Sequence, residues 1–453
     1  MKVPKIMNAS RASLWPDYRT MWRWHFFAGL FCLPFIVLLC LTGSIYLFKP
    51  QVDHWIDWRY DHLAAGATHS TPVQEVRAAL NAVPGSHFLA YELPETTSSA
   101  ARVIVDRQGT AIRVYVDPTS CLVLKQVPEE ERFERIIFKL HGQLLLGNTG
   151  SIIMEMVASW TIMLIATGLY LWWPRRTQGL AGVFYPRITR NGRVRWRDLH
   201  AVTGLWVSSF LALFLVSGLP WSFVWGHALA HVETQFSRLT SVPDWEIGAV
   251  SERNRIAGRP VSPQQTDTMP GMDMGPTAMS DSPLPDNLNQ VVMTASQLGF
   301  PAPVLVTPPS AGETAWAVRS DTQNRPNRIS ALVDPSGSVQ SVHRFEEKAL
   351  ADRVIGYGVA AHEGQLFGKA NQLLNFLVAA GLLTMSTAAL VLWFRRKPPG
   401  KLGMPSVDPS QKIGVGAVGV LIVLGLLLPE LGASLLLLCL ATLLSQVVSH
   451  RRH

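Results

Sequence analysis

Four histidines stand beside long apolar segments of the chain, namely His25, His141, His200 and His362. An ionisable side chain in or next to a membrane span is costly, so it marks a functional site by default. Neutral imidazole is a common iron ligand, and haem iron needs axial ligands that are rigidly aimed. The histidines therefore predict two bis-histidine sites for haem b, one formed by His25 with His200 and one by His141 with His362. Covalent attachment is excluded, because the chain has no CxxCH motif.

Two glycines support the haem interpretation. Gly29 follows His25 by four residues, and Gly204 follows His200 by four residues. Residues four apart lie on one face of a helix, and a glycine leaves room there for a flat macrocycle. The alternative is that the histidines are interfacial residues and that the glycines serve close helix packing.

Two further groups of residues carry weaker signals. His227 and His231 lie four residues apart, so they share a helix face and either hold a metal or a haem or are interfacial residues. A loose methionine cluster stands in a segment rich in Pro, Ser, Gly and Met, and its members are Met269, Met272, Met274 and Met279. Thioethers suit Cu(I), although such a segment is also typical of a flexible loop.

Motifs for a soluble redox cofactor or for hydrolysis are missing from the sequence. The chain has no GxGxxG after a strand, no Walker loop, no HExxH and no nucleophile elbow. A reductase without a flavin or nicotinamide site must take electrons from quinol or from another protein. The motifs therefore identify no catalytic residue.

The elements that position these histidines are predicted to be membrane helices. Of the 453 residues, 48% are hydrophobic and only 16% are charged, whereas soluble proteins carry about a quarter charged residues. About 20 residues of helix cross a hydrocarbon core of about 30 Å. Six apolar segments are predicted to span it, and they lie at 26–48, 152–173, 201–223, 371–394, 411–428 and 431–448. The last two are shorter and form a tight hairpin.

The distribution of charge predicts the topology. The net charge is +8, and the basic residues gather before the first span, between the second and third, after the fourth, and at the C-terminus. All these segments fall on one side of a six-span protein, which is the positive-inside pattern. The pattern predicts a bacterial inner (cytoplasmic) membrane protein in contact with lipid, with both termini in the cytoplasm and the large domains in the periplasm. It argues against nucleic acid as a partner.

The chain also shows an internal two-fold repeat. The steps from His25 to Gly43 and from His200 to Gly218 are both 18 residues long. The histidines that precede the second and fourth spans each lie 31 residues before a tryptophan. Agreement at separate spacings predicts two copies of one unit, which consists of a span, an outer domain, a short helix and a span.

Each outer domain is predicted to be α+β. In the first, a helix is expected over 71–83 with Thr71 as its N-cap, followed by strands over 101–106 and 111–117 around a turn at Gly109. In the second, a helix is expected near 286–298 and strands near 303–306, 314–319 and 329–334. The second domain also carries the methionine-rich insert, at 257–285.

The predicted fold is a polytopic α-helical membrane protein with about six spans, an internal two-fold repeat and two periplasmic α+β domains. Its segments are a cytoplasmic N-terminus with the first span (1–50), the first periplasmic domain (51–140), a periplasmic helix with the second span (141–174), a basic cytoplasmic loop (175–199), the third span (200–225), the second periplasmic domain with its insert (226–360), a periplasmic helix with the fourth span (361–396) and a C-terminal two-span hairpin (397–453).

Several of these marks together resemble the PepSY-associated transmembrane family of bacterial inner-membrane proteins. They are the Trp-Arg-Trp-His25 and Asp198-Leu199-His200 span starts, the Thr42-Gly43 ends, the Asp-Pro turns at 117–118 and 334–335, His141-Gly142-Gln143-Leu144, His362-Glu363-Gly364-Gln365-Leu366, and the Trp-Trp-Pro-Arg-Arg close. The resemblance covers about residues 15–400.

The resemblance implies two PepSY-like periplasmic domains and a haem b protein that reduces a Fe(III)-siderophore at the periplasmic face and releases Fe(II). It also implies that His25, His141, His200 and His362 are the axial ligands. Two alternatives stay open at this point. One is a non-enzymatic PepSY module that binds or regulates a partner or aids metal uptake. The other is a copper-handling membrane reductase that uses the methionine cluster.

Overall fold

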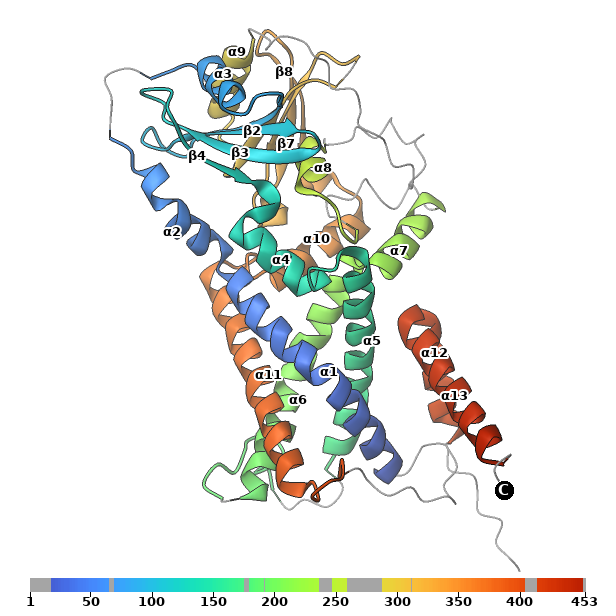
Figure 1. Cartoon of the computed structure of the whole chain (residues 1–453). Coiled ribbons are helices and arrows are strands. Elements are labelled where there is room, and N and C mark those ends of the chain that lie inside the picture. Colours follow the sequence, from blue (N-terminus) through green and yellow to red (C-terminus); the bar gives the residue numbers. More distant parts are fainter. Residues whose placement is uncertain are drawn as a thin grey trace, which may run out of the picture. The chain divides into compact units, whose positions relative to one another are not determined.

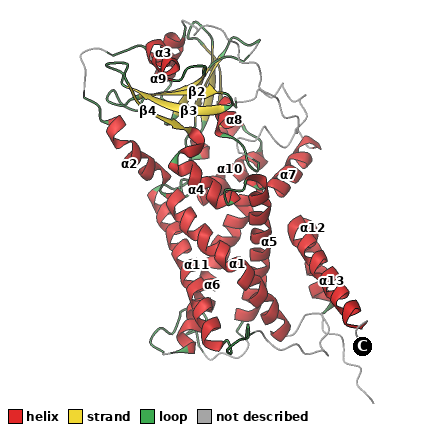
Figure 2. Cartoon of the chain, viewed as in Figure 1, coloured by secondary structure: helices red, strands yellow, loops and turns green. Residues whose placement is uncertain are grey.

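The computed structural model describes residues 18–64, 69–174, 179–190, 192–235, 247–258, 287–310, 312–403 and 414–450, and these form two compact units (Figure 1). The helical unit comprises Met1–Cys40, Ile152–Leu215 and Val378–His453. The sheet unit comprises Leu41–Ser151 and Val216–Leu377. All the strands belong to the sheet unit (Figure 2).

Four long helices supply most of the helical unit. They are α1 (Tyr18–Leu47), α5 (Gly147–Trp172), α6 (Arg193–Gly218) and α11 (Lys369–Arg396). Each of these helices is long and apolar enough to cross a membrane, with α6 counted together with the 3₁₀ turn η2 (Leu219–Trp221) that follows it. These helices coincide with the first four predicted spans.

The C-terminal hairpin is made of α12 (Val415–Leu427) and α13 (Pro429–His450). At 1.5 Å per residue, the 13 residues of α12 extend only about 20 Å, which is short of a core of about 30 Å. Both helices of the hairpin are apolar. The structure therefore supports four spans, and the prediction of six stays a prediction.

The helical unit packs through small and apolar side chains. Cys32, Val157, Val207 and Leu382 are buried together at its centre, one from each long helix. A side chain at Gly381 would come within 2.9 Å of Val207, so glycine is what permits the close approach of α6 and α11. Large apolar residues such as Trp206 and Leu213 face outward, as expected for a surface in contact with lipid.

The sheet unit contains one antiparallel eight-stranded sheet in the order β4-β3-β2-β1-β5-β6-β7-β8. Its strands are β1 (His87–Glu92), β2 (Ala101–Arg107), β3 (Thr110–Val116), β4 (Val123–Pro128), β5 (Val304–Thr307), β6 (Trp316–Ser320), β7 (Ile329–Val333) and β8 (Val339–Arg344). The predicted first and second outer domains thus contribute four strands each, and β1 pairs with β5 where they meet.

Several short helices complete the sheet unit. They are α2 (Lys49–Asp61), α3 (Pro72–Ala82), α4 (Phe133–Gln143), α7 (Phe223–Gln235), α8 (Glu252–Ala257), α9 (Leu288–Gln297) and α10 (Leu350–His362), with 3₁₀ turns η1 (Glu129–Glu131), η3 (Arg325–Asn327) and η4 (Phe345–Glu347). Each half of the chain therefore runs through helix, four strands, short helix and long helix in the same order. The internal repeat itself stays a prediction.

The α+β elements expected from the sequence are present. Thr71 caps α3 in a capping box with Gln74, as the sequence predicted for a helix starting at this residue. The strands β1, β4 and β8 were not predicted. β1 is buried on both faces, so it lacks the alternation of apolar and polar residues that reveals a half-buried strand.

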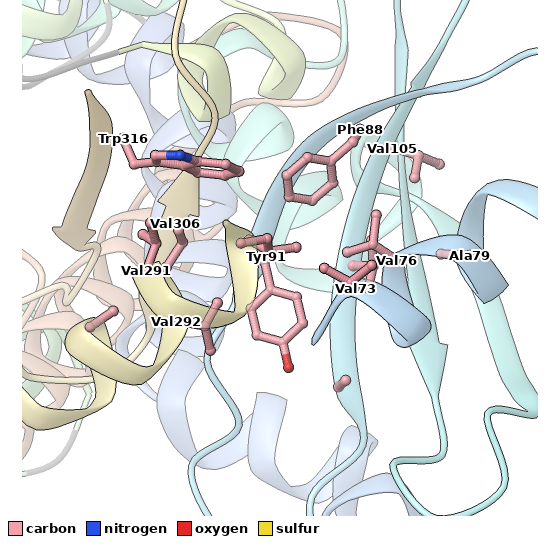
Figure 3. Packing of buried hydrophobic residues seen from close by; sticks show 14 of the residues in the cluster. Val73, Val76, Ala79, Phe88, Tyr91, Val105, Val291, Val292, Val306 and Trp316 are labelled. Carbon is pink, nitrogen blue, oxygen red and sulfur yellow. The ribbon is translucent and has the colours of Figure 1, made fainter. Parts of the chain in front are cut away.

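The two faces of the sheet differ in character. One face packs against α3 and α9, and its core includes Tyr91, Val105, Val306 and Trp316 (Figure 3). Because side chains alternate along a strand, the residues between these point to the opposite face. Charged side chains such as Arg102 and Arg113 are directed there, and they line a cavity.

Candidate functional site

His25 on α1 and His200 on α6 lie next to each other in the helical unit, and we call them the first pair. Their ring centroids are 6.1 Å apart and their planes are inclined at 78°. Two imidazoles that bind one metal from opposite sides have ring centres roughly 6 Å apart, since each nitrogen lies about 2 Å from the metal and about 1 Å from its own ring centre. The spacing of the first pair fits a metal centre between the rings.

The hydrogen bonds of the first pair determine which ring nitrogen is available. His200 Nδ1 lies 3.1 Å from the backbone oxygen of Met385, which can only accept, so Nδ1 carries the proton. His25 Nδ1 lies 3.0 Å from the hydroxyl of Thr167. That hydroxyl donates its own proton to the Met163 carbonyl at 2.8 Å, so it accepts from His25. In this arrangement Nε2 of both rings keeps a lone pair, which is what a metal ligand requires.

His141 in α4 and His362 at the end of α10 form the second pair, in the sheet unit. His141 Nδ1 lies 2.9 Å from the hydroxyl of Thr42, and His362 Nδ1 lies 2.9 Å from the hydroxyl of Ser217. Burial, together with the charge of nearby His362, lowers the pKa of His141 to about 3. His141 is therefore neutral at physiological pH, which is the form that binds metals.

Glycines allow the rings to approach their supporting helices. A side chain at Gly43 would lie 3.1 Å from Cε1 of His141, and one at Gly168 would lie 3.1 Å from Cε1 of His25. At Gly218 the corresponding distance to Cε1 of His362 is 3.9 Å, an ordinary contact. Alanine would thus crowd two of these rings but not the third.

The supporting residues share a sequence signal that our prediction of ligands did not use. Three of the four histidines contact a hydroxyl residue followed by glycine, and these dipeptides are Thr42-Gly43, Thr167-Gly168 and Ser217-Gly218. Thr167 follows His141 by 26 residues, and Ala388 follows His362 by the same number. The fourth dipeptide is therefore absent, and His200 bonds a backbone carbonyl instead.

The two glycines that were predicted to leave room for a macrocycle have different surroundings. A side chain at Gly29 would lie 3.8 Å from Leu164, which is an ordinary contact. A side chain at Gly204 would lie 3.1 Å from Sδ of Met385. The space beside Gly204 is thus bordered by a flexible thioether side chain, which can shift more readily than backbone.

The weaker candidates are not brought into either pair. His227 and His231 lie on α7, and both side chains are exposed. Met269, Met272, Met274 and Met279 lie outside the described residues. Among the residues that the structure describes, no cluster of three or more His, Cys, Asp or Glu side chains is arranged to hold a metal ion.

A cavity of about 1050 Å³ lies in the sheet unit beside the second pair. Its wall includes Glu363, the residue after His362, together with residues of α2, α4, α8, η3 and the charged face of the sheet. None of our predicted site residues lines it. The reason is that its wall is assembled from short segments far apart in the chain, which have no common motif.

Ion pairs balance most of the charge in the cavity wall. Arg113 binds Glu92 at 2.5 Å and Glu129 at 2.6 Å, while Arg255 binds Glu252 at 2.7 Å and Asp321 at 2.6 Å. Burial by itself would raise the pKa of Glu129, but the guanidinium groups of Arg113 and Arg132 outweigh it and hold that pKa at about 2. The charged part of the wall is therefore largely neutralised, which suits a ligand of low net charge.

Not every polar atom of the wall is paired within the described residues. The amide of Gln323, Nε of Arg319 and Nε1 of Trp221 are buried and have no hydrogen-bond partner there. A buried donor without a partner costs about 1–3 kcal/mol, so a ligand that supplies acceptors would gain from binding here.

Comparison with known proteins identifies the family. No curated protein sequence is similar enough to the chain to count as a match. Residues 22–396, which include both histidine pairs and every strand of the sheet, match the family described as the PepSY-associated TM region. The protein is a membrane protein, and it belongs to the PepSY-associated TM family.

Proposed function

We propose that the chain is a haem b transmembrane oxidoreductase that passes electrons to the periplasmic face and reduces a Fe(III)-siderophore there, releasing Fe(II). The observation that carries the proposal is the first pair, where two rings 6.1 Å apart each have Nδ1 engaged in a hydrogen bond. Haem bound between such rings supplies reversible one-electron chemistry.

Each pair contributes two protein ligands to its site. His25 and His200 would hold one haem, and His141 and His362 would hold the other. Because the described residues offer no third His, Cys, Asp or Glu side chain to complete either site, the remaining coordination positions would belong to the cofactor. A site with only two protein ligands would suit haem, which brings further ligands of its own, better than a bare metal ion.

The hydroxyl and carbonyl partners of the histidines would orient the ligands. Such partners fix the tautomer and the ring orientation, and they raise the basicity of the coordinating nitrogen. Gly43 and Gly168 would let the rings sit close to the helices that carry these partners. The chain's contribution is therefore to hold neutral imidazoles still and to keep Nε2 free of protons.

The proposed topology follows the positive-inside pattern. The protein would lie in the bacterial inner membrane with both termini in the cytoplasm, the sheet unit in the periplasm and the C-terminal hairpin as two further spans. The electron donor would be quinol or another protein. The cavity of the sheet unit would receive the ferric chelate, because it is large enough for a drug-sized ligand and adjoins the second pair.

An absorption spectrum of the purified membrane protein tests the proposal. We expect a Soret band in the oxidised protein and a split α band after dithionite, because the two sites differ in their surroundings. A colourless protein would contradict the haem proposal and would favour a non-enzymatic PepSY module. His227→Ala, a change at an exposed histidine outside both pairs, is the matched control and should leave the spectrum unchanged.

The choice of oxidant tests the substrate. Dithionite-reduced protein, freed of excess reductant, is mixed anaerobically with a soluble ferric trihydroxamate or with cupric ion. Rapid return of the oxidised spectrum with the ferric chelate, and a slower return with cupric ion, is the expected result. The reverse order would favour a copper-handling reductase.

A further inference from the structure

Three aromatic residues from separate elements line one side of the cavity, and we call them the aromatic patch. They are Tyr46 of α1, Phe138 of α4 and Trp221 of η2. The ring centroids of Tyr46 and Phe138 are 6.0 Å apart, and those of Phe138 and Trp221 are 6.2 Å apart. These distances are typical of packed aromatic pairs, so the three rings form a continuous apolar surface beside the charged side chains of the wall.

Each ring of the patch is attached to backbone that also holds the second pair. Tyr46 follows Thr42 by four residues, and Phe138 precedes His141 by three residues. Trp221 follows Ser217, the partner of His362, by four residues. Residues three or four apart on a helix are neighbours in space. The patch therefore lies next to the second pair and borders the cavity at the same time.

Trp221 has an unused hydrogen-bond donor at this place. Its indole Nε1 is buried and has no partner among the described residues. The guanidinium of Arg325 lies over its ring, 5.2 Å from the centroid, which helps to hold the ring in one orientation. Buried indole N–H groups usually find an acceptor, and a ligand in the cavity can provide one.

We propose that Trp221 is the residue that contacts the bound ferric chelate. Its N–H donates to a chelate oxygen, and its ring lies on the path of the electron between the second pair and the chelated iron. Fe(III) is a hard cation carried by oxygen donors such as hydroxamate, catecholate and carboxylate, and these oxygens accept hydrogen bonds. This assignment rests on the proposed function.

The step is a one-electron transfer. Chelated Fe(III) would gain one electron and become Fe(II), and a haem held by His141 and His362 would supply that electron. No covalent bond is made or broken, and no proton is required. Fe(II) is bound more weakly by hard oxygen donors than Fe(III), so it then leaves the chelator.

Binding is measured separately from reduction by using gallium(III). A Ga(III) trihydroxamate has nearly the shape and the charge of the ferric complex but accepts no electron under these conditions. Titration calorimetry of the full-length protein with this probe gives Kd for the wild type, Trp221→Phe and Trp316→Phe. Trp316 also has a buried Nε1 without a partner, but it lies in the apolar core of the sheet and does not line the cavity.

Trp221→Phe keeps an aromatic ring and removes the N–H, so Kd should rise about three- to tenfold, as expected for the loss of one hydrogen bond. Trp316→Phe should leave Kd unchanged. An unchanged Kd for Trp221→Phe, or an equal rise for Trp316→Phe, would overturn the proposal.

Reoxidation of reduced protein by saturating ferric trihydroxamate tests the role of the ring. Trp221→Phe should keep a rate close to that of the wild type, while Trp221→Leu should lose most of it with the haem spectrum unchanged. A Trp221→Leu protein that reoxidises as fast as the wild type would remove Trp221 from the electron path. If Trp221→Leu does not fold, Phe138→Leu replaces it in the same assay.

The two proposals fail in distinguishable ways. A protein without a haem spectrum would end the proposed function even if Trp221→Phe weakens binding of the gallium chelate. A protein with both haems and normal reduction, but with chelate binding insensitive to Trp221→Phe, would end only the assignment of Trp221.

Discussion

The two histidine pairs have similar Nδ1 hydrogen-bond supports in different surroundings. In the first pair the histidines stand on the long helices α1 and α6, and their partners come from α5 and α11. In the second pair the histidines stand on the short helices α4 and α10, and their partners come from α1 and α6. Thus α1 and α6 each carry a histidine of one pair and, 17 residues later, a supporting hydroxyl of the other.

The surroundings indicate a division of roles. The first pair lies among the apolar helices of the helical unit, which suits an internal relay. The second pair lies on helices that connect directly to the sheet and its cavity, so under the proposed function it would exchange electrons with a molecule bound there. Similar ligand sets can therefore serve different purposes when one is enclosed by apolar helices and the other adjoins a polar cavity.

The pairs also differ in one hydrogen-bond acceptor. Both supports of the second pair are hydroxyl groups, whereas His200 in the first pair donates to a backbone carbonyl. A carbonyl is the stronger acceptor and makes the imidazole more electron-rich, which stabilises ferric iron. We therefore expect the first site to have the lower reduction potential, so that electrons run from the first pair to the second.

The largest expected effect comes from removing one ligand of each pair. His200→Ala and His362→Ala should each lose about half of the bound haem, because each removes one axial ligand of a separate site. The pyridine haemochrome assay measures the haem that remains. If either variant lost all of its haem, the two sites would not be independent, and unchanged haem content would remove the histidine from the ligand set.

Acid should affect the second site before the first. The pKa of Glu129 in the sheet unit is about 2, below its ordinary 4.5, so its ion pairs stabilise the folded state above about pH 4.5 and are lost as the pH falls towards 2. The loss is on the order of 3 kcal/mol. Stepwise acidification followed by absorbance should release the haem of the second pair first.

A matched variant tests the cause of this difference. Glu129→Gln should weaken the sheet unit already at neutral pH and reduce its further loss of stability in acid, because the charged form that Arg113 and Arg132 stabilise is gone. If the wild type and Glu129→Gln both release their two haems in a single step, the acid sensitivity does not arise in the sheet unit.

Removing one hydroxyl support should weaken a site without abolishing it. Thr167→Val keeps the shape of the side chain but removes the hydroxyl partner of His25 Nδ1, and Ser217→Ala removes the hydroxyl partner of His362 Nδ1. Loss of such a partner typically costs roughly 10–100-fold in metal affinity. Haem titration of the apoprotein should show the weakening in the first site for Thr167→Val and in the second for Ser217→Ala.

The smallest effects are expected at the glycines, where the structure provides a control. Gly43→Ala would place a methyl group 3.1 Å from the ring of His141, whereas Gly218→Ala would place one 3.9 Å from the ring of His362. Crowding of a packed site costs about 1–3 kcal/mol. Gly43→Ala should therefore lower the melting temperature of the haem-loaded protein and Gly218→Ala should not, and equal effects would show that ring crowding is not the cause.

Much of the architecture could be predicted because its causes are local. The four long helices follow from apolar length, and α3 follows from the capping residue Thr71 and the proline after it. The strands β1, β4 and β8 were missed, because their periodicity is weak and their pairing partners lie elsewhere in the chain. A strand of this kind is stabilised by neighbours that no local pattern contains.

The sequence by itself determined which residue types recur at matched spacings, and these include all four histidines of the two pairs. Spacing along a helix reports which residues share a face, because the geometry of the α-helix is regular. Only the tertiary structure decided that Thr42, Thr167 and Ser217 hold those rings, that Met385 replaces the fourth hydroxyl, and that Trp221 borders a cavity. Those contacts join residues between 99 and 185 positions apart, or segments that share no motif, so they exist only once the helices have packed.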